Sequence, residues 1–206
     1  MTPQTWRIVT VCTGNVCRSP LAAALINHWA AQLDHTSDIH ATSTGVMAAI
    51  GAPMHPDAIA IARALGADPA PHRGAQLTIR DLRGANLVLA AARTHRAEVA
   101  RILPSAAPYS YTIRELAHLS GLKPVPTDSH TDAVCPSSLY DTASVRLGEI
   151  ARRRGLAPRT NPDDDDIADP INGGEAAFRR METELVPALR AVFDALFLPQ
   201  VIQVDS

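Results

Sequence analysis

A ten-residue stretch near the start of the chain constrains the fold more than any other feature. Residues 11–20 read VCTGNVCRSP and follow a short β-branched run at 6–11, which predicts a buried strand. Ser19 and Pro20 then predict the start of a helix, because serine is a favoured N-cap and proline fits the first turn. The stretch is therefore expected to form a tight, glycine-containing loop between a strand and a helix.

The remaining hydrophobic pattern predicts an α/β fold. Apolar or β-branched runs at 39–44, 86–90 and 107–111 predict further strands, and helical spacing predicts helices at 19–33, 56–65, 93–103, 112–119 and 140–154. The clearest helix is expected to follow Gly174, with a kink at Pro187. Strands that alternate with helices form βαβ units, so we expect a small four-stranded parallel sheet flanked by helices.

The stretch 121–167 differs from the rest of the chain. It contains five prolines, and residues 163–166 are all aspartate. Such a composition predicts irregular, solvated chain, which the helix at 140–154 interrupts. We therefore expect a single domain over residues 1–206 that carries a surface insertion at 121–167.

Composition narrows the classes of function. The chain is 46% hydrophobic and has a formal net charge of −2, which gives no basic excess for binding nucleic acid. We find neither a secretory signal nor an apolar run long enough for a membrane, and three cysteines without a framework spacing suit a reducing cytoplasm. The spacing of Cys12 and Cys17 does not suit zinc, so no metal and no cofactor are expected.

The loop combines the groups that covalent phosphoryl transfer needs. The unpaired N–H groups and the dipole of a helix N-terminus form an anion site, and the same field favours a thiolate. Cys12 lies at the strand end, and Arg18 follows where a short loop can curl back to bind two phosphate oxygens. A sulfur beneath a bound dianion suits a cysteinyl-phosphate intermediate. The alternative, a cysteine that only packs, is disfavoured by the complete C-x5-R-S pattern.

This loop resembles that of the low molecular weight protein tyrosine phosphatases, which share their fold with one class of arsenate reductase. Further similar stretches are STG at 43–45, GAP at 51–53, HRGAQLT at 72–78 and DP at 169–170. The resemblance covers roughly residues 6–119 and 167–197. It implies the phosphatase-loop version of the α/β fold.

The resemblance also implies a role for each site residue. Cys12 would be the nucleophile, Arg18 would bind the phosphate, and Asp169 would be the general acid and then the general base. Ser19 would hydrogen-bond the sulfur, and Asn15 would hold the loop through Ser43 and His72. The expected phosphate-binding loop and its supports are Thr13, Gly14, Asn15, Val16, Cys17, Ser19, Ser43 and His72.

Some assignments leave alternatives open. Asp166 is the second candidate for the acid, while the aspartate run at 163–166 is otherwise expected to be a solvated surface. His72 suits a structural role as well as a role at the site. His55 and His95 are expected to be ordinary surface residues.

The two cysteines other than Cys12 have separate interpretations. Cys17 either packs in the first helical turn or, as the resemblance implies, forms a reversible disulfide with Cys12 that a thiol reductant would reopen. Cys135 lies in the insertion and is expected to be free and inert.

Departures from the family pattern concern the mouth of the pocket. Ile171 and Ala48 stand where many members carry aromatic side chains, so both walls of a phosphotyrosine slot are expected to be absent. Ala75 replaces an arginine, and Val16 stands where phosphoarginine-directed members carry threonine. Preference for phosphotyrosine is therefore in doubt, and phosphoarginine is disfavoured.

Three functions follow from these observations. The first is a phosphomonoester hydrolase of the protein-tyrosine-phosphatase type, acting on a phosphoprotein or a small phosphomonoester. The second is an arsenate reductase, although a relay of cysteines would have only Cys135 to draw on. The third is a module that binds phosphoproteins without catalysis, although Cys12, Arg18 and Asp169 are all present.

Overall fold

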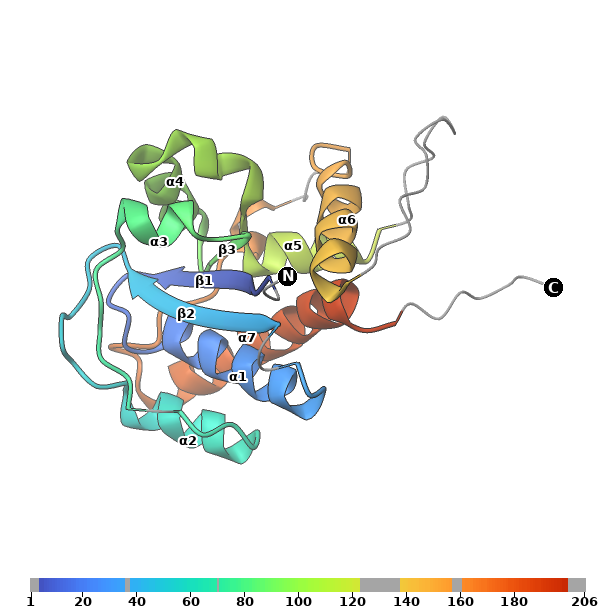
Figure 1. The fold of residues 1–206 in the computed structure, drawn as a ribbon. Coiled ribbons are helices and arrows are strands. Elements are labelled where there is room, and N and C mark those ends of the chain that lie inside the picture. Colours follow the sequence, from blue (N-terminus) through green and yellow to red (C-terminus); the bar gives the residue numbers. More distant parts are fainter. Residues whose placement is uncertain (1–3, 36–37, 70, 123–137, 157–160, 200–206) are drawn as a thin grey trace, which may run out of the picture.

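The computed structural model describes residues 4–35, 38–69, 71–122, 138–156 and 161–199. A four-stranded parallel sheet in the order β2-β1-β3-β4 forms its centre (Figure 1). The strands are β1 (Trp6–Cys12), β2 (Ile39–Gly45), β3 (Leu87–Ala90) and β4 (Ser110–Thr112). The predicted α/β class and the four-stranded parallel sheet are thus confirmed.

Helices cover both faces of this sheet. On one face lie α1 (Arg18–Gln32), α2 (Pro56–Ala64) and α7 (Gly174–Phe197), and on the other lie α3 (Ile79–Arg83) and α4 (Arg93–Ile102) (Figure 1). The helices α5 (Ile113–Ser120) and α6 (Leu139–Ala151) pack against α7 and belong to the same core as α1. Alternation along β1 explains the two layers, because Trp6 and Ile8 belong to the larger core and Val9 and Val11 to the smaller one. No helix of the described chain is long and apolar enough to cross a membrane.

Two local predictions were wrong. The strand predicted at 107–111 begins three residues later, because Pro104–Tyr109 forms a 3-10 helix and Pro108 lacks the N–H that a strand needs. The helix α3 was missed because its five residues are too short to show a period. A capping box between Thr78 and Asp81 starts it, and this pair is the signal that could have revealed it.

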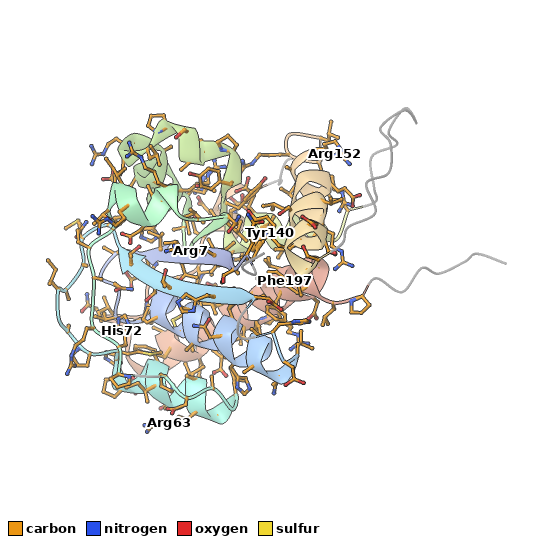
Figure 2. The ribbon with its side chains drawn as sticks, in the orientation of Figure 1. Arg7, Arg63, His72, Tyr140, Arg152 and Phe197 are labelled. Carbon is orange, nitrogen blue, oxygen red and sulfur yellow. The ribbon has the colours of Figure 1, made fainter. Side chains whose placement is uncertain are left out.

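The last two helices extend the larger core beside the start of β1. Figure 2 labels Tyr140 on α6 and Phe197 at the end of α7 in this region. The Phe197 ring meets Trp6 edge to face with centroids 5.4 Å apart. The Trp6 indole N–H donates to Ser144 Oγ at 3.2 Å. Pro187 lies inside α7, which runs from Gly174 to Phe197 as one helix, and the expected kink stays a prediction.

Helix α6 belongs to the segment that was expected to be a surface insertion. Ala143 and Ile150 on this helix are buried in the larger core. Just beyond it, the Arg153 guanidinium is buried and donates to the carbonyl of Leu119 at 2.9 Å. This part of 121–167 therefore packs against α5 and α7, whereas Cys135 lies outside the described residues.

Packing of α6 predicts unequal effects of two truncations on one helix. Ile150→Ala removes a side chain that is 4% exposed, so the free energy of unfolding should fall by about 2–4 kcal/mol. Val145→Ala, at a residue that is 45% exposed, is the matched control and should change it by less than about 0.5 kcal/mol. Urea unfolding measures both. Equal, small effects would show that α6 does not contribute to the core.

Candidate active site

The parallel strands bring three loops to one edge of the sheet. Cys12 at the end of β1 is paired with Gly45 at the end of β2, and Val11 with Ala90 at the end of β3. A Cβ atom on Gly45 would lie 2.5 Å from the carbonyl oxygen of Thr13, so only glycine allows this close approach. The carboxyl ends of parallel strands are where α/β folds place their ligands.

The loop after β1 leads directly into the N-terminus of α1. The helix begins at Arg18 with Cys17 as its N-cap, so the prediction that Ser19 is the cap was wrong. The Ser19 hydroxyl is engaged elsewhere, 2.9 Å from Cys12 Sγ and 3.2 Å from the carbonyl oxygen of Thr44. The side chain expected to contact the sulfur is therefore in place.

Asn15 holds the shape of this loop. It is fully buried and has φ +55°, a left-handed conformation that non-glycine residues adopt at a cost. Its Nδ2 donates to Ser19 Oγ at 2.9 Å and to Ser43 Oγ at 3.0 Å. Its Oδ1 accepts the backbone N–H of Ala75 at 2.8 Å, and its carbonyl oxygen lies 2.7 Å from His72 Nε2.

His72 thus supports the loop from the segment between α2 and α3, where Figure 2 labels it. A carbonyl oxygen can only accept a hydrogen bond, so His72 Nε2 must carry a proton. His72 Nε2 therefore donates a hydrogen bond to the carbonyl oxygen of Asn15. The structure places His72 behind the loop, in contact with its backbone, rather than among the residues that line the cavity. Its position supports a structural role.

Arg18 joins the loop to the segment before α7. Its side chain is buried, and Nη1 donates to the carbonyl of Ile167 at 3.1 Å. Its Nη2 donates to Thr13 Oγ1 at 3.3 Å and to Asp169 Oδ2 at 2.5 Å. A cavity of about 140 Å³ lies at this point, lined by Cys12, Thr13, Gly14, Val16, Cys17, Arg18, Asp169 and Ile171.

The two candidates for the acid occupy different surroundings. Asp169 lines the cavity, and its Oδ1 accepts the backbone N–H of Ile171 at 3.3 Å. Asp166 instead accepts from the backbone N–H of Arg93 at 2.7 Å and from the Arg93 guanidinium, which also pairs with Asp163. The geometry favours Asp169, and part of the aspartate run is tied to α4 rather than simply solvated.

Cys17 is a buried thiol beside Cys12. Burial, followed by the nearby Cys12 and Asp169 charges, raises the pKa of Cys17 to about 12. Cys17 therefore stays protonated at neutral pH, and both cysteines are free in this structure. The reversible disulfide between them stays a prediction.

The prediction that His55 and His95 are ordinary surface residues was wrong. The His55 side chain caps the N-terminus of α2, and its ring stacks on Phe178 with centroids 4.6 Å apart. His95 is buried, and its Nε2 lies 2.9 Å from Thr13 Oγ1. Burial and the Arg18 charge lower the pKa of His95 to about 4. The only sequence signal for His95 was its place in the first turn of the helix after β3.

A larger cavity of about 510 Å³ lies behind the loop, along the exposed edge of β2. Ser43 and His72 are among its lining residues, but Cys12, Arg18 and Asp169 are not. The smaller cavity is therefore the candidate active site, because among the cavities described only this one brings a cysteine thiol together with a buried guanidinium and a carboxylate.

Comparison with known proteins agrees with a phosphate-handling site on this fold. A family model described as "Low molecular weight phosphotyrosine protein phosphatase" matches residues 7–121. A protein-arginine-phosphatase of Geobacillus stearothermophilus is 33% identical over 110 residues, or 53% of this chain and 70% of the relative. A probable low molecular weight protein-tyrosine-phosphatase of Ralstonia solanacearum is 33% identical over 98 residues, or 48% of this chain and 63% of the relative.

Solved structures extend the similarity. A low molecular weight protein tyrosine phosphatase from T. tengcongensis is 32% identical, with a TM-score of 0.52 over 73% of this chain and 97% of that one. An arginine phosphatase from Geobacillus stearothermophilus is 26% identical, with a TM-score of 0.62 over 93% of this chain and 92% of that one. The chain belongs to the low molecular weight phosphotyrosine protein phosphatase family, a family of cysteine-dependent phosphatases.

The hydrogen bonds of Asn15 predict a stability loss on its removal. Asn15→Ala keeps the left-handed backbone but deletes the bonds to Ser19, Ser43 and Ala75, so the free energy of unfolding should fall by about 2–4 kcal/mol. Asp34→Ala is the matched control, because Asp34 also has a positive φ of 58° but is exposed. The free energy of unfolding of Asp34→Ala should differ from the wild-type value by less than about 1 kcal/mol. Similar losses in both variants would attribute the effect to the backbone alone.

Proposed function

We propose that the chain is a phosphomonoester hydrolase of the protein-tyrosine-phosphatase type that works through a cysteinyl-phosphate. The observation that carries this proposal is that Cys12, Arg18 and Asp169 line one small cavity at the N-terminus of α1. A thiolate, a cation that is always charged, and a carboxyl group are the three groups that such a reaction needs. No step requires a metal or a cofactor.

In the first step, Cys12 Sγ attacks the phosphorus and the bond from phosphorus to the ester oxygen breaks. The leaving oxygen takes its proton from the Asp169 carboxyl, so the alcohol departs neutral. Arg18 and the loop N–H groups bind the equatorial oxygens and stabilise the charge of the transition state. A dianion seated there competes with Asp169 for the guanidinium.

In the second step, water attacks the phosphorus and the bond from phosphorus to sulfur breaks. The Asp169 carboxylate, now deprotonated, accepts a proton from this water. The Ser19 hydroxyl lies 2.9 Å from Cys12 Sγ, and by turning its proton from the Thr44 carbonyl it can donate to the sulfur and stabilise the departing thiolate. Inorganic phosphate leaves, and Cys12 and Asp169 return to their starting protonation states.

The walls of the cavity bear on the substrate. Val16 and Ile171 are its larger apolar lining residues, and none of the lining residues is aromatic. An aromatic stacking pair contributes about 0.5–1.5 kcal/mol, so its loss reduces preference for an aryl ester by roughly threefold to tenfold. We therefore propose a phosphoprotein or small phosphomonoester as substrate, with weak selection for the tyrosine ring and, from Val16, no preference for phosphoarginine.

The two other functions receive less support. Arsenate reduction needs further cysteines to relay electrons, and in the described chain only Cys17 accompanies Cys12. A module without catalysis would not need the carboxyl group that Asp169 brings to the cavity.

We place the enzyme in the cytoplasm, where a thiol reductant would keep Cys12 reduced and reopen a disulfide with Cys17. We also propose that residues 1–206 form a single domain with an insertion at 121–167.

Hydrolysis of two aryl phosphates tests the roles of Cys12 and Asp169. Cys12→Ser should reduce hydrolysis of p-nitrophenyl phosphate at least about 1000-fold, because a serine hydroxyl is not ionised there. Asp169→Asn should lower kcat about 100-fold or more for phenyl phosphate, and less for p-nitrophenyl phosphate, whose leaving group needs less protonation. Initial rates give both values.

Asp166→Asn is the matched control for the acid, because the Asp166 carboxylate binds Arg93 instead of lining the cavity. Its kcat should remain within about threefold of the wild-type value. A loss confined to Asp166→Asn would transfer the acid role to that residue. Arsenate reduction with a thiol donor that far exceeds phosphate release would favour the reductase instead.

Restoring one aromatic wall tests the substrate class. Ile171→Tyr should lower KM for a phosphotyrosine peptide by roughly threefold to tenfold, because the ring can stack on the substrate. Ile171→Leu is the control of similar size and should leave KM unchanged. KM for a small alkyl phosphate should not respond to either variant. Tighter binding of every ester would indicate a general change of the cavity instead.

A further inference from the structure

The Thr13 hydroxyl lies between two nitrogen atoms. His95 Nε2 is 2.9 Å from Thr13 Oγ1, and Arg18 Nη2 donates to the same oxygen at 3.3 Å. Thr13 also lines the cavity beside Cys12 and Asp169. The direction of its hydroxyl proton therefore depends on which of its neighbours donate.

His95 is a neutral imidazole at the pH where the protein is expected to work. Its side chain is buried, and burial together with the Arg18 charge lowers the pKa of His95 to about 4, although Asp169 and Asp166 act in the opposite direction. A neutral imidazole has one N–H and one acceptor nitrogen. His95 can therefore either donate to Thr13 or accept from it, according to its tautomer.

The surroundings of the second ring nitrogen favour the donating tautomer. His95 Nδ1 is buried and has no hydrogen-bond partner among the described residues. A proton on Nδ1 would leave a buried N–H without an acceptor, which is rare in proteins. A proton on Nε2 leaves only an unmatched lone pair at Nδ1. His95 is therefore assigned as a donor to Thr13 Oγ1.

A hydroxyl group accepts two hydrogen bonds and donates one. Arg18 and His95 supply both bonds that Thr13 Oγ1 can accept, so its own proton must point elsewhere. The cavity that Thr13 lines offers that direction. We propose that the Thr13 hydroxyl donates a hydrogen bond to an oxygen of the phosphoryl group, and that His95 is the positioning residue that orients it.

This inference rests on the proposed phosphatase function and adds one neutral donor to it. A donor fixed before substrate arrives stabilises charge that grows in the transition state without a cost of reorientation. His95 acts only through Thr13, so changes at the two positions should not add. A His95 that merely fills space would lower stability but would leave recognition of the oxyanion unchanged.

Four single variants separate these roles. Thr13→Val removes the hydroxyl and keeps the shape, so kcat/KM for p-nitrophenyl phosphate should fall about 10- to 100-fold. Thr13→Ser keeps the hydroxyl and should recover most of the activity that Thr13→Val loses. His95→Gln places an amide N–H near the position of Nε2 and should also retain activity, whereas His95→Asn is too short and should lose about 3- to 10-fold.

Inhibition by orthovanadate is compared with inhibition by inorganic phosphate, because a variant that only loses packing would not change the ratio of the two inhibition constants. Vanadate resembles the transition state, so Thr13→Val and His95→Asn should weaken its inhibition more than that of phosphate. The double variant Thr13→Val/His95→Asn should be no less active than Thr13→Val alone. Urea unfolding confirms that each variant is folded at the assay temperature.

The outcomes distinguish this inference from the function on which it rests. Folded Thr13→Val with kcat/KM and vanadate inhibition within twofold of wild type overturns it, as does an additive double variant. Equal activity of His95→Gln and His95→Asn removes the positioning role even if Thr13→Val does not fold. A wild-type protein that neither hydrolyses p-nitrophenyl phosphate nor binds vanadate contradicts the phosphatase proposal itself.

Discussion

The structure of the candidate site depends on the hydrogen bonds of one buried side chain, Asn15. Its left-handed backbone turns the loop so that Cys12 and Arg18 face the same cavity, and such a turn costs free energy by itself. Partners from α1, from β2 and from the segment at 72–75 offset that cost. Because the fold fixes the loop, the free energy of binding a phosphoryl group need not order it.

The carboxyl group reaches this loop from the far end of the chain. Arg18 donates to Ile167, whose own N–H donates to Ala91 at 2.8 Å just after β3. The next residue, Ala168, donates its N–H to Glu184 on α7 at 2.8 Å. The position of Asp169 therefore depends on the sheet, on α7 and on Arg18 together, so the site forms only when the whole fold does.

The strand–loop–helix arrangement around Cys12 could be predicted from the sequence because its residues are neighbours in the chain. Cys12, Arg18 and Ser19 lie within one strand–loop–helix unit, and the roles proposed for Asn15 and Asp169 come from resemblance to the family. His95 was missed because its burial results from the packing of α4 beside Thr13, and one histidine on a polar helix gives no sign of that. The helix at 140–154 was predicted, and its core residues Tyr140, Ala143, Leu147 and Ile150 recur at helical spacing. Its packing against the core was missed because the prolines and aspartates around it favoured a solvated surface segment.

In the proposed enzyme, phosphoryl transfer and selection among esters depend on different parts of this cavity. Its floor consists of buried groups with fixed hydrogen bonds, Cys12 and Arg18 above all, which in the proposed reaction would contact the phosphoryl group of any ester. Its wall consists of Val16 and Ile171, and aliphatic side chains exclude water without imposing the geometry of a stacked ring. In the proposed enzyme, binding energy drawn from the phosphoryl oxygens is common to all phosphate esters and so does not discriminate among them. Selection among them must then come from contacts beyond the phosphorylated side chain.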